Sequence, residues 1–169
     1  MKTITLTRGY VAIVDDEDFE ELSQYKWCAN PLSQNRCYAQ RSGRRVNGKQ
    51  QKHVLMHRQI LDAKKGQMVD HINHNGLDNR RENIRIATNR QNQWNQHKHR
   101  DSKSKYRGIC WHKDYRKWMA RISGPEGRIT IGFFDSEDDA ALAYDSRAKA
   151  IYGEFAHLNF TNPISHPQR

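Results

Sequence analysis

The N-terminal part of the chain alternates apolar and polar residues over short distances. Between Ile4 and Val14 the alternation is interrupted by Arg8-Gly9, which predicts one or two short strands. Six acidic residues then crowd positions 15–21, with Phe19 and Leu22 as inward positions. Acidic side chains favour the positive end of a helix, so this stretch predicts a short helix. A second metal site among the acids is the alternative interpretation.

A tight-turn signal, Asn47-Gly48, marks the next region. It predicts a β-hairpin whose strands lie within Cys37–Arg45 and Gln50–Met56, because Asn-Gly suits the left-handed backbone of a two-residue loop. Trp27 and Tyr38 are large and mostly apolar. We expect them to anchor the core rather than to stack on bases.

The middle of the chain carries the most informative pattern. A short strand ends at Asp70-His71, and a loop rich in turn residues follows. Ile84 and Ile86 then alternate with polar residues, which predicts a second strand that is half buried. Thr88 and Gln91 have the spacing of a capping box, so a helix is expected to begin there. The predicted order is strand, loop, strand, helix.

The last third of the chain predicts a separate module. Asp135 or Ser136 caps a predicted helix that continues to about Tyr152. Three alternating runs before it predict strands at 106–111, 116–122 and 128–134. The helix has a small apolar face that allows close approach to a sheet. This face comprises Ala140, Ala141, Ala143, Tyr144, Ala148 and Ile151.

Composition limits the classes of protein. The chain has 169 residues, 36% of them hydrophobic, and a formal net charge of +10. These values suit two or three small modules and a polyanionic partner. No apolar stretch has the length of a membrane span, and the start lacks the apolar part of a secretory signal. Three cysteines without Cys-x-x-Cys spacing disfavour a zinc site or a disulfide framework, so a reducing cytosol is expected.

Four polar side chains are candidates for chemistry, because the predicted strands and helix can bring them together. Asp70 and His71 end one strand, Asn83 opens the next, and Asn92 lies one turn into the helix. Carboxylate and amide oxygens suit Mg²⁺, which keeps part of its shell for water and phosphate. An imidazole titrates near neutrality and can take a proton from water. The set suits metal-assisted phosphodiester hydrolysis, although each residue alone is also an ordinary loop residue.

This central stretch, with the run Val54–Leu61 before it, resembles the HNH endonuclease motif in its ββα-metal form, as in phage and intron-encoded homing endonucleases. The resemblance implies that Asp70 and Asn92 bind one divalent metal ion, Mg²⁺ or Mn²⁺. It also implies that His71 is the general base and that Asn83 orients its ring. The last motif position is asparagine where the family name has histidine, and an amide oxygen can still be a ligand.

Two further histidines near the motif have their own interpretations. His57 lies in the upstream run. It either packs against the motif as a structural residue or is an accessory group at the scissile phosphate. His74 lies in the turn, where a solvated loop histidine is expected.

The C-terminal module resembles the plant Apetala-two/ethylene-response-factor DNA-binding domain. The matching pieces are Tyr106-Arg107-Gly108, Lys117–Ile122, Ile131–Phe134, Ala140–Asp145 and Leu158-Asn159-Phe160. The resemblance implies a three-stranded sheet that enters the major groove of DNA. It does not extend to the plant recognition sequence, because the strands depart from the plant pattern. The implied DNA contacts, of which Trp118 is also a candidate core residue, are Arg107, Trp111, Arg116, Trp118, Arg121 and Arg128.

A second basic region lies before the motif. Residues 23–61 contain no acid, which favours DNA contact over a merely solvated surface. The polar, basic segment 97–105 lacks apolar periodicity and is expected to be a linker, with a metal site at His97 and His99 as the less favoured alternative. The expected DNA contacts before the motif are Arg41, Arg44, Arg45, Lys49 and Lys52.

These patterns together predict an α+β protein. The predicted parts are a ββα-metal nuclease domain with a β-rich basic N-terminal region at 1–96, a linker at 97–105, a three-stranded antiparallel sheet packed on one helix at 106–160, and a tail at 161–169. The predicted activity is site-directed, metal-dependent cleavage of double-stranded DNA, by a monomer that nicks or a weak dimer that cuts both strands.

Two alternatives stand beside this activity. A non-catalytic, sequence-specific DNA-binding regulator could keep the nuclease fold, and an RNA nuclease fits less well because a sheet suits the major groove of B-form DNA. We expect no membrane partner and no small-molecule substrate. The expected location is the cytoplasm of a phage-infected or bacterial host cell.

Overall fold

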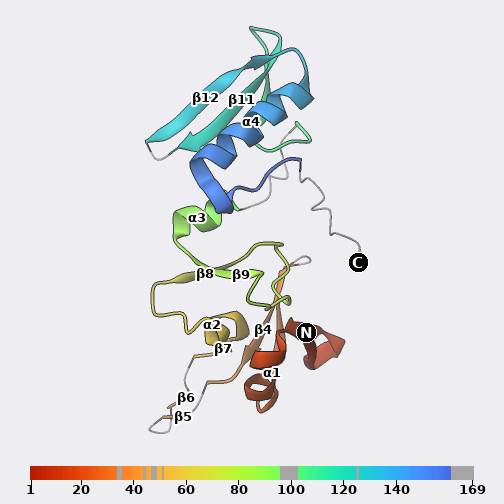
Figure 1. Cartoon of the computed structure of the whole chain (residues 1–169), viewed down its shortest axis with the longest axis vertical. Coiled ribbons are helices and arrows are strands. Elements are labelled where there is room, and N and C mark those ends of the chain that lie inside the picture. The colour runs from red at the N-terminus through yellow and green to blue at the C-terminus, as the bar shows by residue number, and fades with distance from the viewer. Residues whose placement is uncertain are drawn as a thin grey trace. The chain divides into compact units, whose positions relative to one another are not determined.

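The computed structural model describes residues 1–33, 36–43, 45–46, 49–50, 52–95, 103–124 and 126–160, with the backbone alone at 33, 36, 45–46 and 49–50. The chain divides into two compact units, Met1–Asn92 and Gln93–Arg169. Each unit has its own hydrophobic core. Figure 1 shows the helices and strands of both units. In the described parts of the chain, no helix has both the length and the apolar character needed to span a membrane.

The first unit begins as the sequence predicts, with two short strands and an acidic helix. Strand β1 (Lys2–Thr5) pairs antiparallel with β2 (Val11–Val14) across the 3-10 helix η1 (Thr7–Gly9). Helix α1 (Asp16–Ser23) follows, with three acids in its first turn and Leu22 buried. The helix reading of the acidic stretch is confirmed.

A second sheet lies beside this pair, in the order β3-β4-β7. It consists of β3 (Cys28–Ser33), β4 (Arg36–Arg41) and β7 (Val54–Leu55), all antiparallel. The sequence does not predict β3, because Pro31 lies inside it. An edge strand tolerates proline, since one side of its backbone needs no partner.

The expected hairpin is present in shorter form than predicted. Strand β5 (Arg45–Val46) pairs with β6 (Lys49–Gln50), and Asn47-Gly48 between them lies outside the described residues. The predicted second strand does not reach Met56, because that residue begins helix α2 (Met56–Ile60). Trp27 is 2% exposed and donates from its indole nitrogen to the carbonyl oxygen of Leu22 at 2.8 Å, so its predicted core role is confirmed.

The central stretch has the predicted order of elements. Strand β8 (Met68–His71) pairs antiparallel with β9 (Ile84–Ala87), and helix α3 (Asn89–Trp94) follows. The capping box is confirmed: Thr88 and Gln91 exchange backbone-to-side-chain bonds of 2.8 and 3.2 Å. Strand β9 is half buried as predicted, but only one of its two isoleucines is buried. Ile84 is 3% exposed and Ile86 is 39% exposed.

The second unit is a three-stranded antiparallel sheet with helix α4 along one face (Figure 1). Ser136 caps that helix, because its hydroxyl oxygen accepts from the backbone N–H groups of Asp138 and Asp139. Ala140, Ala141 and Ala148 are fully buried, which confirms the small-residue face. The elements are β10 (Ile109–His112), β11 (Lys117–Gly124), β12 (Gly127–Phe134), α4 (Glu137–Tyr152) and the 3-10 helix η2 (Gly153–Phe155).

Strand β10 begins three residues later than predicted, and Gly108 explains why. Its φ of +77° lies in the left-handed region and interrupts the extended backbone. A Cβ at this position would lie 2.1 Å from the ring of Tyr144, so glycine also allows the chain to pass close to α4. Asn159 holds the preceding segment, because its Oδ1 accepts the N–H of Arg107 at 2.7 Å while its own N–H donates to Asp145 at 2.8 Å.

Candidate functional site

His71 is the centre of a buried polar region at the end of β8. It is 6% exposed, and its Nε2 lies 3.4 Å from Oδ1 of Asn79. The amide nitrogen of Asn79 donates to the carbonyl oxygen of Leu77 at 3.2 Å, which fixes the end of the amide that faces the ring. Because an amide oxygen can only accept, this pairing places the proton on Nε2 of His71 and the lone pair on Nδ1.

Two further rings pack around this imidazole. The ring of His57, from α2, lies edge-on at 5.0 Å between centroids, and the ring of Tyr38, from β4, lies at 5.7 Å. Tyr38 and His57 also contact each other at 5.2 Å. Gly76 in the loop permits this packing, since a Cβ there would lie 2.5 Å from the Tyr38 ring. The orientation of His71 is therefore fixed by ring packing as well as by hydrogen bonding.

Burial keeps both imidazoles uncharged. It lowers the pKa of His71, and the hydrogen bond to Asn79 and the charges of Asp70 and Asp78 offset only part of this effect. Burial lowers the pKa of His57 to about 3, with smaller contributions from His71 and Arg58. Nδ1 of His57 is buried without a hydrogen-bond partner in the described structure. A general base has to be neutral before it accepts a proton, and His71 meets that condition at neutral pH.

The loop between β8 and β9 holds Asn79 in place. Nδ2 of Asn83 donates to the carbonyl oxygen of Asp78 at 2.7 Å, and its Oδ1 accepts the N–H of Asn73 at 3.0 Å. Backbone bonds of 2.8 Å join Ile13 of β2 to the residues on either side of Asp78. The sequence predicts that Asn83 orients His71. These bonds of Asn83 hold the loop, and Asn79 is the amide that faces the ring.

Asp70 lies beside His71 and is bound by an arginine. In the register of the β8–β9 pair, Asp70 stands directly opposite Arg85. Nε and Nη2 of Arg85 donate to Oδ2 of Asp70 at 3.0 and 2.9 Å. The side chains are only 12% and 6% exposed. This ion pair is largely withdrawn from water, where charge-assisted bonds are strong.

The donor chemistry of Asp70 and Asn92 fits a hard divalent cation. One offers a carboxylate and the other an amide oxygen, from β8 and from half-buried α3. Within the described ranges, no group of three or more His, Cys, Asp or Glu side chains is placed to hold a metal ion. Two protein ligands would leave most of the shell to water and phosphate, which is usual for Mg²⁺.

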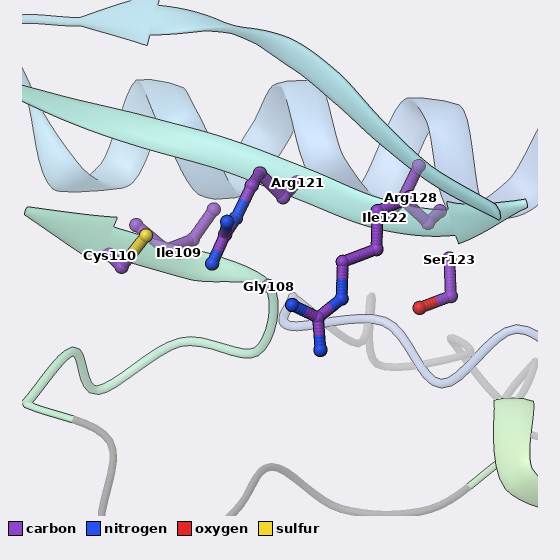
Figure 2. A pocket seen from close by; sticks show the side chains of 7 residues that line it. All are labelled: Gly108, Ile109, Cys110, Arg121, Ile122, Ser123 and Arg128. Atoms are coloured by element: carbon purple, nitrogen blue, oxygen red, sulfur yellow. The ribbon is translucent and has the colours of Figure 1, made fainter. Parts of the chain in front are cut away.

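The second unit presents an open sheet face opposite α4. Arg121 and Arg128 are exposed there and line a shallow pocket of about 270 Å³ (Figure 2). Beyond them, His112, Tyr115 and Phe133 form an aromatic cluster with centroid distances of 4.7 to 5.4 Å. Strand alternation places His112 and Phe133 on the same open face. Sequence reasoning does not single out this cluster.

Two predicted DNA contacts lie on the other face of the sheet. Trp111 and Trp118 are cross-strand partners whose rings meet at 5.3 Å. Their positions alternate along the strands with those of the residues on the open face. Trp118 packs against the hydrophobic core of the unit. The core reading of Trp118 is therefore supported. Arg116 is exposed in the turn between β10 and β11, at φ +49°.

Other predicted DNA contacts have structural partners or lie outside the described side chains. The guanidinium of Arg41 lies 4.2 Å from the ring centroid of Tyr25. Arg107 donates to the carbonyl oxygens of Trp94 and Gln93, at the end of α3. Lys52 is exposed. Arg44 lies outside the described residues, as do the side chains of Arg45 and Lys49 and the histidines His97 and His99.

Comparison with known proteins decides the family. The family model described as HNH endonuclease matches residues 52–94. The uncharacterized HNH endonuclease L560 of Acanthamoeba polyphaga mimivirus is 30% identical over 159 residues, covering 90% of this chain and 76% of L560. The chain belongs to the HNH endonuclease family. The matched segment contains the β8–β9 pair, the loop and helix α3.

Other relatives match shorter stretches of the chain. The dehydration-responsive element-binding protein 2C of Arabidopsis thaliana is 49% identical over 59 residues, 31% of this chain and 17% of the plant protein. Protein 3.8 of Escherichia phage T7 is 27% identical over 94 residues, covering 56% of this chain and 77% of the phage protein. The chain thus spans less than a fifth of the plant protein that it matches. No solved structure gives a significant match.

Three residues of this candidate site are not assigned to it by sequence reasoning. Asn79 looks like an ordinary turn residue, and only the docking of the loop buries it. Tyr38 reaches the site from a strand that is distant in the sequence, and no local sequence pattern predicts that contact. Arg85 could have been found, because pairing the two strands so that their polar ends align places it opposite Asp70.

Proposed function

We propose that this HNH endonuclease hydrolyses DNA in a metal-dependent reaction, as a homing-type nicking enzyme, with His71 as general base. The observation that carries the proposal is a neutral, buried imidazole that is held by Asn79 and follows the buried carboxylate of Asp70 along β8. Buried polar groups arranged in this way are costly for stability, and active sites are where such arrangements concentrate.

The chain's own groups account for the proton and for the fixed geometry. Nδ1 of His71 accepts a proton from water while the water oxygen bonds to phosphorus and the bond from phosphorus to the 3′ oxygen breaks. The leaving oxygen takes a proton from solvent, which yields a 5′-phosphate and a 3′-hydroxyl. Asp70 and Asn92 would hold one Mg²⁺ or Mn²⁺. A cation bound there stabilises negative charge on the phosphate and on the leaving oxygen.

The second unit supplies affinity for double-stranded DNA in this proposal. The plant relative is named as a protein that binds a responsive element. The chain carries a formal net charge of +10, and the open sheet face presents Arg121 and Arg128. Arginine bonds guanine bidentately and pairs with phosphate, so these two side chains suit a DNA groove.

A supercoiled-plasmid assay tests the proposed function. The full chain is incubated with plasmid and Mg²⁺ or Mn²⁺, with an EDTA control. We expect metal-dependent conversion to open circles, because one chain carries one such site. Linear product without an open-circle intermediate would indicate paired sites in a dimer. Absence of cleavage on DNA that the protein binds at a specific site would instead favour a non-catalytic DNA-binding regulator.

A further inference from the structure

Arg85 occupies the carboxylate that the proposed function assigns to the metal. Two nitrogens of its guanidinium donate to the same oxygen of Asp70, at 2.9 and 3.0 Å. The pair spans directly opposed positions of β8 and β9, so the backbone register itself brings the two side chains together. A cation that binds Asp70 therefore has to share the carboxylate with the Arg85 guanidinium or displace it.

We propose that Arg85 neutralises Asp70 in the metal-free protein and becomes a catalytic residue by transferring its hydrogen bonds to the scissile phosphate. The inference rests on the proposed function, since it takes Asp70 as a ligand. It adds a residue, a role and an order of events that the proposed function does not contain.

Charge balance supports the transfer. One carboxylate and one guanidinium cancel in the metal-free site. A divalent cation leaves an excess of two positive charges in a largely buried place, where excess charge is strongly disfavoured. The phosphodiester group carries one negative charge before the reaction, and it carries about two when water attacks the phosphorus. The site formed by Asp70, Arg85 and one divalent cation is therefore neutral only around the reacting phosphate.

The chemistry of the side chain supports the same step. The planar fork of arginine matches a phosphate as well as a carboxylate, so it can exchange one partner for the other without losing hydrogen bonds. The neighbouring Arg80 is not placed to exchange its partner in this way. It binds both carboxylate oxygens of Asp78 at 2.8 Å and also pairs with Glu82, inside the loop that fixes Asn79.

The first test measures metal binding by the DNA-free full chain. Mn²⁺ affinity is determined by electron paramagnetic resonance for wild type and Arg85→Gln. Removing the competing guanidinium should tighten binding by about tenfold or more. The matched control is Arg81→Gln. Arg81 lies four positions before Arg85, its side chain is 46% exposed, and it pairs with Glu17 and Asp18 of α1 rather than with Asp70. The control should bind Mn²⁺ with wild-type affinity.

The second test measures single-turnover cleavage at saturating DNA and Mn²⁺. Arg85→Gln should cleave roughly a hundredfold to a thousandfold more slowly although it binds the cation more tightly. Tighter binding with slower cleavage separates this role from simple structural support, which would weaken both. Arg85→Lys keeps the charge but not the fork, so it should recover part of the rate, and Arg81→Gln should cleave like wild type.

The outcomes separate the two proposals. If the wild-type protein neither binds Mn²⁺ nor cleaves DNA, both the proposed function and this inference are wrong. Wild type that does both, with Arg85→Gln binding Mn²⁺ no more tightly or cleaving at the wild-type rate, overturns the inference alone. If Arg85→Gln does not fold even with Mn²⁺, Arg85→Lys decides, and its cleavage at the full wild-type rate overturns the proposed role.

Discussion

The two units bury different kinds of side chain. In the first unit, a group of polar residues is buried beside the apolar core, and they come from α2, from β8 and from the loop after β8. They are His57, Asp70, His71, Asp78, Asn79 and Asn83. The second unit also buries the polar residues Asn95, Ser104 and Asp145. Its core cluster, however, consists of isoleucine, alanine and tyrosine side chains between the sheet and α4.

The difference shows how each unit serves its proposed role. A buried imidazole has a fixed direction and a lowered pKa only because several distant segments surround it. Burying these polar groups lowers the stability of the unit but provides the groups that the proposed reaction needs. The second unit needs only to hold a flat basic face rigid, and alanine packing achieves this at little cost. Perturbations should therefore act on the two units in different ways.

Acid should produce the largest difference between the units. The pKa of His57 is about 3 in the folded state, against about 6.5 in an unfolded chain. Between these values the unfolded state binds more protons, so the first unit loses stability as the pH falls from about 6.5 towards 3. The slope approaches about 1.4 kcal/mol per pH unit for one such histidine.

Denaturant unfolding of each unit, followed by hydrogen exchange at a series of pH values, measures this slope. His57→Phe keeps a ring of similar shape and removes the titrating group, so its first unit should lose less stability in acid. An unchanged slope in His57→Phe would show that other groups cause the acid sensitivity.

A substitution at Gly108 should act mainly on the second unit. Gly108→Ala places a Cβ 2.1 Å from the Tyr144 ring and forces a non-glycine residue to φ +77°. We expect a loss of about 2–4 kcal/mol in the unfolding free energy of that unit. Gly66→Ala is the matched control, because Gly66 also has a positive φ but has open space around its Cβ. The control should lose only about 1 kcal/mol.

The basic face should matter for affinity and not for the chemical step. Arg121→Gln and Arg128→Gln should each weaken DNA binding by about tenfold and reduce the slope of log affinity against log salt by about one. Cleavage of saturated DNA should be unchanged. Arg147→Gln, at an exposed position of α4, is the control, and its salt slope should equal that of wild type. Equal losses in all three variants would mean that the charge acts at long range only.

The smallest expected effect concerns the start of α3. Thr88→Ala removes one half of the capping box, which should destabilise this helix by about 1 kcal/mol. Hydrogen exchange of the α3 amides measures the loss. Thr130→Ala changes an exposed strand threonine and should leave those amides unaffected. Equal exchange in Thr88→Ala and wild type would contradict a role for the cap.

Local patterns predicted local structure well. The capping box at Thr88 and the cap at Ser136 follow from short spacings that need no tertiary contact, and both are present. Three strands and a helix in the second unit also follow from alternation. Strand β3 could not be predicted in this way, because Pro31 disfavours a strand unless the strand is known to lie at the edge of a sheet.

Long-range contacts account for what the sequence did not show at the site. Asp70 and His71 could be placed at the end of a strand from the local pattern. Asn79 could not be distinguished from other loop asparagines, because its burial depends on hydrogen bonds between the loop and Ile13 of β2. Tyr38 joins the site only because Gly76 lets the loop approach it.

Single-turnover cleavage by wild type and His71→Ala, on DNA bound to saturation in Mg²⁺, tests the central claim most directly. DNA affinity is measured on the same samples. The account predicts that the variant keeps its affinity within about twofold and loses cleavage by about 10²–10⁴-fold, the range of a general base. Cleavage by His71→Ala at the wild-type rate, with affinity intact, would contradict the assignment of His71 as the base.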